Sequence, residues 1–389
     1  MDLDAFRWLL TDAGQELLAR AGQLLADDPL RAAEALRRDE APEHAAAALT
    51  QVELRRRAAA KFGDLAAKMY FTPEGLEQAT RLRVAEHRAS RLVAAATRSV
   101  VDLGCGVGGD LVAFARAGIT SAGVDLDPVR VAVAEANLAA LGLGGAVAVA
   151  DATTVDTSPF DVAFADPARR SARGRSFDVD AWTPPWSFVE TLLQRTSCVK
   201  AAPGLPHDLV PEGVEAEWVS DRGEVKEVAL WSGRLATTAR RATVIADGGL
   251  ATLTSEDDPG AAVREPGRFL YEPDGAVIRA GLVTAVADGV HGGLLDGHLA
   301  WVTSDDAFLT PFARSFEVVE QLPFREKQLR AALRERGIGS LTIKTRGVNV
   351  VPEQLRRRLA LTGEQEATIV LTRARGHGAC FLVRPLRAG

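Results

Sequence analysis

Cysteine is scarce in this sequence, which has only Cys105, Cys198 and Cys380 among 389 residues. Three scattered cysteines exclude a disulfide framework and a C-x-x-C zinc or redox site, and we expect no metal. Long apolar runs are missing too, since none reaches the roughly 20 residues that span a bilayer. The acidic start, with Asp2 and Asp4, is unlike the basic start of a secretory signal. With 47% hydrophobic and 25% charged residues, disorder is excluded, and we predict a soluble cytoplasmic protein without a membrane partner.

Basic residues are concentrated at the C-terminal end of the chain. Between Leu322 and Gly389 there are 14 lysine and arginine residues against five acidic residues, a net charge of +9. Because the whole chain carries -6, the part before Leu322 carries -15. A basic segment on an acidic body suggests a polyanionic partner. The alternative is an arginine-rich helix surface that is simply solvated.

The first part of the chain, residues 1–97, has apolar residues at helical spacing and predicts a helical region. Its last helix begins after Thr72, a typical N-cap, with Pro73 at the first helical position, and we expect it to continue to Val93. Residues 98–245 instead alternate short apolar runs with helical patterns. This alternation predicts an α/β fold, with a parallel sheet covered by helices and closed by an antiparallel hairpin.

Two further segments complete the predicted organisation. Residues 246–314 are rich in glycine and aspartate and form a connecting region, in which we expect one helix at 276–287. Residues 315–389 alternate strands and helices again, which predicts a small, basic α+β domain.

A glycine-rich segment, Gly104-Cys105-Gly106-Val107-Gly108-Gly109, lies where a strand is expected to turn into a helix. Glycines there let a ligand approach the backbone, and a helix N-terminus offers free N–H groups. The spacing fits the dinucleotide fingerprint G-x-G-x-x-G, with Asp125 about 20 residues further on. A lone match of this kind is weak evidence, and a strand–helix turn that holds no ligand is the structural alternative.

Acidic residues are placed around this turn and at the ends of three further strands. Asp102 precedes the first glycine by two residues, and Asp125, Asp151 and Asp166 end the other strands. The carboxyl ends of parallel strands line one crevice. A carboxylate at Asp102 suits a cation, such as the ammonium and sulfonium of S-adenosylmethionine, better than a pyrophosphate. Asp125 could accept both ribose hydroxyls and Asp151 the adenine amino group, so the pattern predicts a site for a positively charged nucleoside.

These motifs together resemble the class I S-adenosylmethionine-dependent methyltransferases, which have a Rossmann-like sheet. The likeness rests on four motifs in the same order: Val100-Val101-Asp102-Leu103-Gly104-Cys105-Gly106-Val107-Gly108, Asp125, Asp151-Ala152 and Asp166-Pro167. The resemblance implies S-adenosylmethionine as the cofactor. It also implies which residues hold each part of the cofactor: Asp102, Gly104, Cys105, Gly106 and Gly108 the methionine, Asp125 the ribose, and Asp151 with Ala152 the adenine.

The wider chain resembles a bacterial group of methyltransferases that end in a THUMP-like domain. This likeness lies in Tyr70–Thr80, in Lys200-Ala201-Ala202-Pro203-Gly204 and in the tail from Phe316 to Pro385. The Thr-Pro-Glu start of the core is also distantly similar to the trimethylguanosine synthases, which methylate the exocyclic amine of a guanine cap. THUMP domains bind RNA, so the resemblance implies an RNA partner, in agreement with the charge of the tail.

The segment Asp166-Pro167-Ala168-Arg169 departs from the pattern of the methyltransferases that act on exocyclic base amines. Those enzymes usually have Asn/Asp-Pro-Pro followed by an aromatic residue, which orient the amine and stack on the base. Asp166 can still be the catalytic acceptor, and we expect Pro167 beside the substrate. The arginines that follow could stack on a base, hold a phosphate or belong to a solvated loop: Arg169, Arg170, Arg173 and Arg175.

Further candidates for substrate contact lie outside these motifs. Phe71 and Thr72 could close over the methionine end or the target base, although a hydrophobic staple explains Phe71 nearly as well. Trp186, with Trp182, could supply the missing stacking surface, although aromatic residues more often belong to the core. Phosphate contacts in the tail are expected from cations that flank its predicted strands: Lys344, Arg346, Arg373 and Arg375.

We therefore predict a methyltransferase that acts on RNA at an exocyclic base nitrogen, with Asp166 orienting the nucleophile. A binding protein that no longer transfers methyl groups is one alternative, supported by the altered Asp-Pro-Ala-Arg motif. A nicotinamide-dependent oxidoreductase is another, against which Asp102 argues, and methylation of a protein or small molecule is a third. A covalent route to a base carbon is disfavoured because Cys105 belongs to the glycine loop and Cys198 to a predicted strand.

Overall fold

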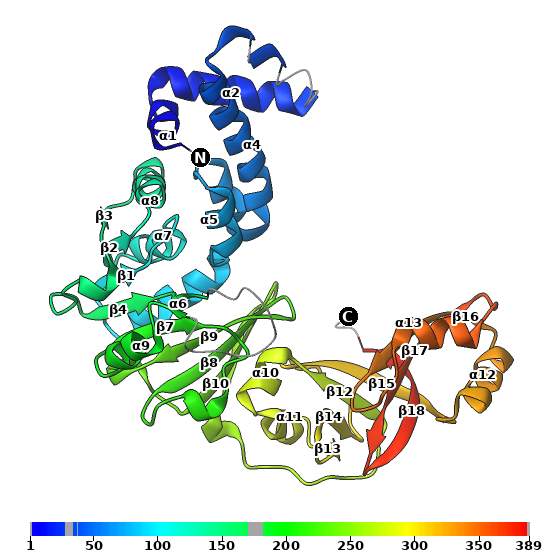
Figure 1. Ribbon diagram of the computed structural model, residues 1–389. Coiled ribbons are helices and arrows are strands. Elements are labelled where there is room, and N and C mark those ends of the chain that lie inside the picture. The colour runs from blue at the N-terminus through cyan, green and yellow to red at the C-terminus, as the bar shows by residue number, and fades with distance from the viewer. Residues whose placement is uncertain (1, 28–33, 37, 170–181, 387–389) are drawn as a thin grey trace. The chain divides into compact units, whose positions relative to one another are not determined.

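The computed structural model describes residues 2–27, 34–36, 38–169 and 182–386. They divide into two compact units, which Figure 1 shows with their elements labelled. Unit 1 comprises Met1–Glu215 and Val228–Thr237, and unit 2 comprises Ala216–Glu227 and Thr238–Gly389. The four segments expected from the sequence stay a prediction. No helix within the described ranges is long and apolar enough to cross a membrane.

Helices form the N-terminal part of unit 1, as predicted: α1 (Leu3–Leu9), α2 (Asp12–Asp27), α4 (Pro42–Phe62), the 3-10 helix η1 (Gly63–Ala67), α5 (Pro73–Gln78) and α6 (Leu82–Ala94). Thr72 is the N-cap of α5, because its hydroxyl accepts a hydrogen bond from Gly75 N at 2.9 Å. The single helix expected after Thr72 is wrong, since α5 ends at Gln78 and Ala79 turns away with ψ 135°. The Lys61 ammonium binds three carbonyl oxygens at this end and stabilises the break.

A nine-stranded sheet carries the predicted parallel core, with the order β11-β10-β8-β9-β7-β4-β1-β2-β3. The strands are β1 (Ser99–Leu103), β2 (Thr120–Asp125), β3 (Ala146–Val149), β4 (Val162–Ala165), β7 (Ser197–Ala201), β8 (Glu215–Asp221), β9 (Glu224–Trp231), β10 (Arg240–Ala246) and β11 (Gly249–Thr254). The connecting helices are α7 (Gly109–Arg116), α8 (Pro128–Ala140) and α9 (Trp186–Leu193). Strands β3, β2, β1, β4 and β7 pair in parallel, and β9 runs antiparallel to β7.

Helices α6 and α7 cover one face of this sheet. Ala85, Ala89 and Leu92 of α6 and Phe114 of α7 pack with strand residues that all point to the same side: Val100, Val162, Phe164 and Cys198. Because side chains alternate along a strand, the next residues on this side at the carboxyl ends are Asp102, Asp166 and Lys200. The apolar packing of the sheet therefore sets where the polar residues at its edge lie.

Unit 2 contains a seven-stranded sheet with the order β13-β14-β12-β15-β18-β17-β16. Its elements are β12 (Phe269–Pro273), α10 (Gly275–Ala280), α11 (Val283–Gly289), β13 (Gly293–Asp296), β14 (Leu299–Ser304), β15 (Ala313–Leu322), α12 (Glu326–Glu335), β16 (Ile338–Thr345), α13 (Pro352–Leu359), β17 (Gln365–Ala374) and β18 (His377–Pro385). The alternation predicted for the tail is confirmed. The glycine-rich connecting region, in which the sequence indicated one helix, supplies three strands of the same sheet.

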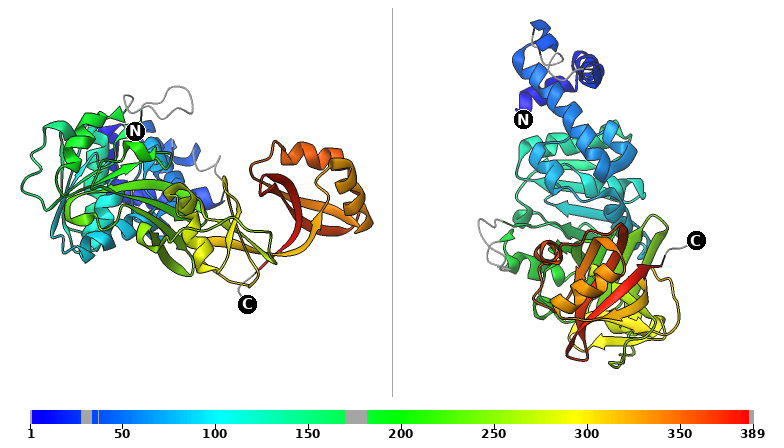
Figure 2. Two further views of the ribbon diagram at one scale, coloured as in Figure 1. Left: turned by 90° about the horizontal axis from the view of Figure 1, so that it is seen from below. Right: turned by 90° about the vertical axis from the view of Figure 1, so that its right-hand side faces the viewer.

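Two details of unit 2 follow from local chemistry. The helix expected at 276–287 is wrong, because Gly281 has φ +68° and ends α10 before α11 begins. Helices α12 and α13 lie on one face of the sheet, as Figure 2 shows. Leu329 and Leu333 of α12 pack there with Leu355 and Leu359 of α13. The arginines of α13 consequently remain exposed.

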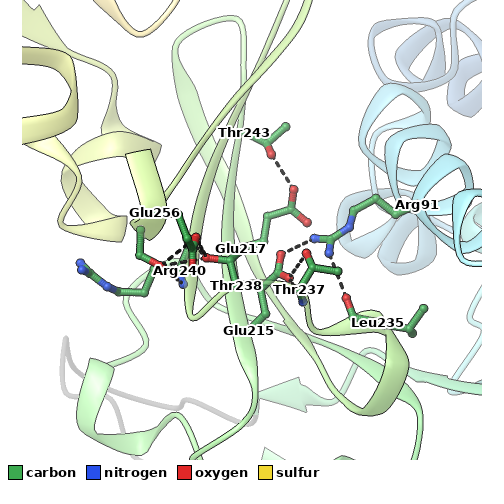
Figure 3. A network of polar contacts seen from close by, with 10 residues as sticks. Arg91, Glu215, Glu217, Leu235, Thr237, Thr238, Arg240, Thr243 and Glu256 are labelled. Carbon is green, nitrogen blue, oxygen red and sulfur yellow. Dashed lines mark hydrogen bonds and ion pairs between the residues drawn. The ribbon is translucent and has the colours of Figure 1, made fainter. Parts of the chain in front are cut away.

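A buried ion pair joins α6 to β8 in unit 1 (Figure 3). Arg91 Nη1 donates to Glu215 Oε1 at 2.7 Å, and the two side chains are 16% and 0% exposed. The second carboxylate oxygen accepts from the backbone N–H of Thr237 at 2.8 Å. The Arg91 guanidinium also lies 4.2 Å from the centre of the Trp231 ring. A nearby buried acid in unit 2, Glu217, accepts from the Thr243 hydroxyl at 2.5 Å.

We predict that Glu215→Ala lowers the free energy of unfolding by about 3–5 kcal/mol, because it removes the carboxylate that faces a desolvated guanidinium. Urea unfolding measures this loss. Asp247→Ala is the matched control, since Asp247 and Arg222 form an ion pair with side chains 77% and 62% exposed. The control should change stability by less than about 1 kcal/mol. Equal losses of stability in Glu215→Ala and Asp247→Ala would contradict the stabilising role of the buried ion pair.

Candidate functional site

The glycine loop links β1 to α7 and leaves open space at its centre. Gly106 has φ +56°, and a Cβ atom built there would meet nothing within 4 Å. Gly108 has φ +80°, and its Cβ atom would lie 3.1 Å from Ala134 Cβ of α8. Gly106 thus leaves room for a ligand against the backbone, whereas Gly108 lets α8 approach the loop.

Asp102, at the end of β1, is 1% exposed. Its Oδ1 atom has no hydrogen-bond partner among the described residues. Burial raises the pKa of Asp102 well above its ordinary value, and the carboxylates of Asp110 and Asp166 raise it further, while Arg88 opposes them. Arg88 forms a buried ion pair with Asp110 and lies over the Phe164 ring at 4.6 Å. A buried acceptor without a donor is costly, so this position is suited to a cationic ligand.

Asp125, at the end of β2, is tied to the glycine loop. Its Oδ2 atom accepts from Gly106 N at 3.0 Å, and its Oδ1 atom accepts from Asp127 N at 2.9 Å. Leu126, between the two aspartates, is 64% exposed. Sequence reasoning missed Leu126, although a large apolar residue next to the expected ribose acceptor was a visible signal. Its side chain offers an apolar surface for a purine ring.

Asp151 follows β3 and caps the 3-10 helix η2 (Ala152–Thr154). Its carboxylate accepts from the backbone N–H and the hydroxyl of Thr153, at 2.9 and 2.8 Å. These two bonds lower the pKa of Asp151 and keep it ionised. Asp151 remains exposed, so an acceptor oxygen is available beside the η2 turn that Ala152 begins.

Asp166 follows β4 and forms an ion pair that the sequence did not suggest. Lys200 of β7 donates to Asp166 Oδ2 at 2.5 Å and to the Thr80 hydroxyl at 3.1 Å. The Oδ1 atom of Asp166 has no hydrogen-bond partner within the described part of the chain. Pro167 is buried directly after it. The structure places Asp166 next to the glycine loop, since a Cβ atom built at Gly104 would lie 4.0 Å from the backbone oxygen of Asp166.

The segment after Pro167 forms a short hairpin of β5 (Ala168–Arg169) and β6 (Trp182–Thr183), in which Arg169 pairs with Trp182. Arg170, Arg173 and Arg175 lie outside the described residues. Trp186 at the start of α9 is half-buried, and its ring packs edge-on against Trp182 at 5.2 Å. Its indole N–H donates to Glu190 at 3.1 Å.

Helix α5 packs directly on the glycine loop. A Cβ atom at Gly75 would lie 2.4 Å from Val107 Cγ1, so only glycine fits there. Phe71 is fully buried against Phe62, with ring centres 5.4 Å apart. The buried position of Phe71 agrees with the interpretation that its ring packs against neighbouring apolar residues. It does not leave the ring exposed for stacking on a base. Thr72 is also buried, and its hydroxyl caps α5.

The tail residues expected to contact phosphate differ in their surroundings within unit 2. Lys344 donates to Glu272 Oε2 at 2.6 Å and lies 5.3 Å from the Phe316 ring centre. Arg375 is paired with Glu265. A hydrogen bond from the backbone N–H of His298 is the main cause that lowers the pKa of Asp296, and the charge of Arg373 lowers it further. Arg346 makes no side-chain hydrogen bond or ion pair with the described residues. Lys344 is therefore partly neutralised, whereas Arg346 is not.

The residues at the crevice fit S-adenosylmethionine. Asp102 has a buried acceptor without a donor, Gly106 leaves open space, and Asp125 and Asp151 present carboxylate oxygens on the neighbouring strands. Within the described ranges, no three histidine, cysteine or acidic side chains are arranged to hold a metal ion. The groups that fit a cationic nucleoside are therefore carboxylates and the backbone of the glycine loop.

We predict that the affinity for S-adenosylmethionine rises with pH as Asp102 ionises. A cationic ligand favours the ionised carboxylate, so binding lowers the raised pKa of Asp102 and releases a proton where the free site is protonated. Asp102→Asn should weaken binding by about 10- to 100-fold and remove this dependence. Calorimetric titration between about pH 5 and pH 9 measures both effects. The control Asp156→Asn alters an exposed carboxylate, and an Asp102→Asn profile like that of the control would contradict the role of Asp102.

Comparison with known protein families agrees with this geometry. Residues 100–169 match a methyltransferase domain, which covers β1, the glycine loop and Asp166. Residues 313–385 match a THUMP-like domain, which covers β15 to β18. Residues 2–58 match a domain of unknown function.

Relatives cover nearly the whole chain. Two S-adenosylmethionine-dependent methyltransferases from strains of Mycobacterium tuberculosis are each 40% identical to it over 352 residues, which are 86% of this chain and 95% of theirs. A crystal structure of a methyltransferase from Porphyromonas gingivalis W83 has the same fold, with a TM-score of 0.78 and 23% identity over 96% of this chain and 99% of that one. The chain belongs to the S-adenosylmethionine-dependent methyltransferases, with a Rossmann-like class I sheet and a THUMP-like domain at its C-terminal end.

Proposed function

We propose that this methyltransferase acts on RNA at an exocyclic nitrogen of a base. The observation that carries the proposal is Asp166, a carboxylate at the end of β4 beside the glycine loop, with one oxygen paired to Lys200 and the other without a partner among the described residues. An exocyclic amine has two hydrogens, and a carboxylate oxygen that accepts one of them directs the nitrogen lone pair.

The chemistry requires orientation more than proton removal. When bound, S-adenosylmethionine supplies a methyl group on a positively charged sulfur. Asp166 would accept a hydrogen bond from the amine and stabilise the positive charge that grows on the nitrogen as the new N–C bond forms and the bond between the methyl group and sulfur breaks, which leaves the sulfur neutral. The extra proton can leave once the bond is complete, so Asp166 need not act as a strong base.

The two cysteines near the site do not support a covalent route to a base carbon. Cys105 is 7% exposed, and burial raises the pKa of its thiol far above the ordinary range. Cys198 is fully buried within β7. A thiol that stays protonated and inaccessible is a poor nucleophile, which favours direct transfer to nitrogen.

The preference for RNA rests on the charge of unit 2. The segment from Leu322 onward carries a net charge of +9, and Arg356, Arg357 and Arg358 are exposed on α13. Part of this charge is neutralised, since Glu326 pairs with Arg330 and Arg358. The side chain of Arg357 makes no hydrogen bond or ion pair with the described residues. A surplus of unpaired guanidinium groups is suited to a phosphate backbone.

We predict that Asp166→Ala reduces methyl transfer to RNA by about 100-fold or more, while the affinity for S-adenosylhomocysteine, whose sulfur is uncharged, changes by less than about 2-fold. Asp166→Asn keeps an acceptor oxygen and should retain part of the activity. The assay measures radiolabelled methyl groups in RNA, with protein and small-molecule extracts as separate arms. The control Asp156→Ala should be fully active. Transfer by Asp166→Ala at the wild-type rate, or labelling of only the protein or small-molecule arm, would overturn the proposal.

A second prediction concerns RNA affinity. Arg346→Ala and Arg357→Ala should each weaken RNA binding and reduce the slope of log affinity against log salt by about 1, because each removes one phosphate contact. Lys344→Ala should have a smaller effect, since Glu272 already neutralises Lys344. Filter binding over a series of salt concentrations measures the slopes. Unchanged slopes in both arginine variants would show that these cations are only solvated.

A further inference from the structure

Lys200 occupies a position that is unusual for lysine. It lies in β7, inside the nine-stranded sheet, and its side chain is only 16% exposed. Strands β4 and β7 pair in parallel with Ala165 opposite Val199, so the next residues, Asp166 and Lys200, emerge side by side on the same face. Placing an ammonium in a sheet interior is costly unless a partner compensates it.

Two oxygens on different elements hold the Lys200 ammonium. Its Nζ atom donates to Asp166 Oδ2 at 2.5 Å and to Thr80 Oγ1 at 3.1 Å. Thr80 is 7% exposed and precedes α6, so its hydroxyl is fixed by the packing of that segment. Lys200 therefore connects a rigid hydroxyl to one oxygen of the Asp166 carboxylate.

The same ammonium reduces repulsion among the acids of the crevice. The negative charge of Asp166 acts on buried Asp102, and Asp110 and Asp125 add to it. Without a cation at this point, the Asp166 carboxylate would be driven away from Asp102 toward solvent. With Oδ2 bound, the carboxylate has one orientation, and Oδ1 is the oxygen left for a substrate.

We propose that Lys200 is a positioning residue for methyl transfer: it holds Asp166 Oδ2 so that Oδ1 can accept the hydrogen bond of the target amine. This inference rests on the proposed function, because it takes Asp166 as the acceptor. Lys200 itself neither touches the amine nor exchanges a proton. Its contribution is the orientation of Asp166, which should appear in kcat rather than in the affinity for RNA.

The test compares Lys200→Met with the wild type. We expect kcat for RNA methylation to fall by about 10- to 100-fold, because a misplaced acceptor no longer directs the amine lone pair. KM for RNA should change little. Lys200→Arg should recover part of kcat, since a guanidinium can still bind the carboxylate, and Thr80→Val should give an intermediate loss. Lys226→Met is the matched control, because the Lys226 ammonium pairs with exposed Glu224 and not with a carboxylate of the crevice.

A second readout needs no RNA. Removing the ammonium makes the crevice more negative, so Lys200→Met should bind S-adenosylmethionine more tightly relative to uncharged-sulfur S-adenosylhomocysteine, with the affinity ratio rising several-fold. A purely structural role for Lys200 would leave this ratio unchanged while lowering both affinities. Calorimetric titration of wild type, Lys200→Met and Lys226→Met with both ligands measures the ratio.

The outcomes separate this inference from the proposed function. If Asp166→Ala is inactive but Lys200→Met keeps the wild-type kcat, the inference is overturned and the proposed function stands. If the wild type methylates no RNA, the proposed function fails, and an unchanged affinity ratio overturns the inference as well. If Lys200→Met does not fold, Thr80→Val and Lys200→Arg test the inference instead. Wild-type kcat in both of these variants would overturn the inference.

Discussion

Repulsion between carboxylates at one edge of a parallel sheet is the constraint on which this site depends. Burial raises the pKa of Asp102, and the negative charges of Asp110, Asp166 and Asp125 raise it further. Arg88 and Lys200 compensate part of this charge through ion pairs with Asp110 and Asp166. Backbone N–H groups at Gly106 and Asp127 compensate Asp125. The remaining negative charge is what a cofactor with a sulfonium and an ammonium group can neutralise.

Two buried amides, one in the N-terminal helix α4 and one in α8, hold the chain before α5 at this site. Gln51 of α4 exchanges hydrogen bonds with the backbone of Phe71, at 2.7 and 3.0 Å. Asn137 of α8 does the same with Tyr70 and also donates to the Val107 carbonyl of the glycine loop at 2.8 Å. Because both amides are 0% exposed, these bonds are protected from water. They hold the chain before α5 against the glycine loop.

In unit 2, several of the basic residues that carry the positive charge also form ion pairs within the fold. The strands of the connecting region extend the sheet of the THUMP-like domain. The basic segment is therefore part of a larger sheet than its own roughly 70 residues form. Several of its cations have structural partners, such as Arg336 with Glu320 and Lys344 with Glu272. The charge available to a polyanion is therefore smaller than the net charge of the segment, and it is carried by residues such as Arg346 and Arg357.

The sequence alone determined the class of the fold, the glycine loop and the acids at the strand ends, because these depend on periodicity and on short motifs whose spacing is local. It also indicated the cap at Thr72. It did not reveal that Gly281 divides a helix, that glycine-rich residues near 300 join a sheet, or that Phe71 is core. In the sequence, Lys200 attracts attention only as part of a segment that resembles other methyltransferases. Its partner Asp166 lies 34 residues away along the chain, so the sequence did not predict the ion pair between them. Only the register of β4 against β7 places that ammonium beside the carboxylate, and register is set by the packing of the whole sheet.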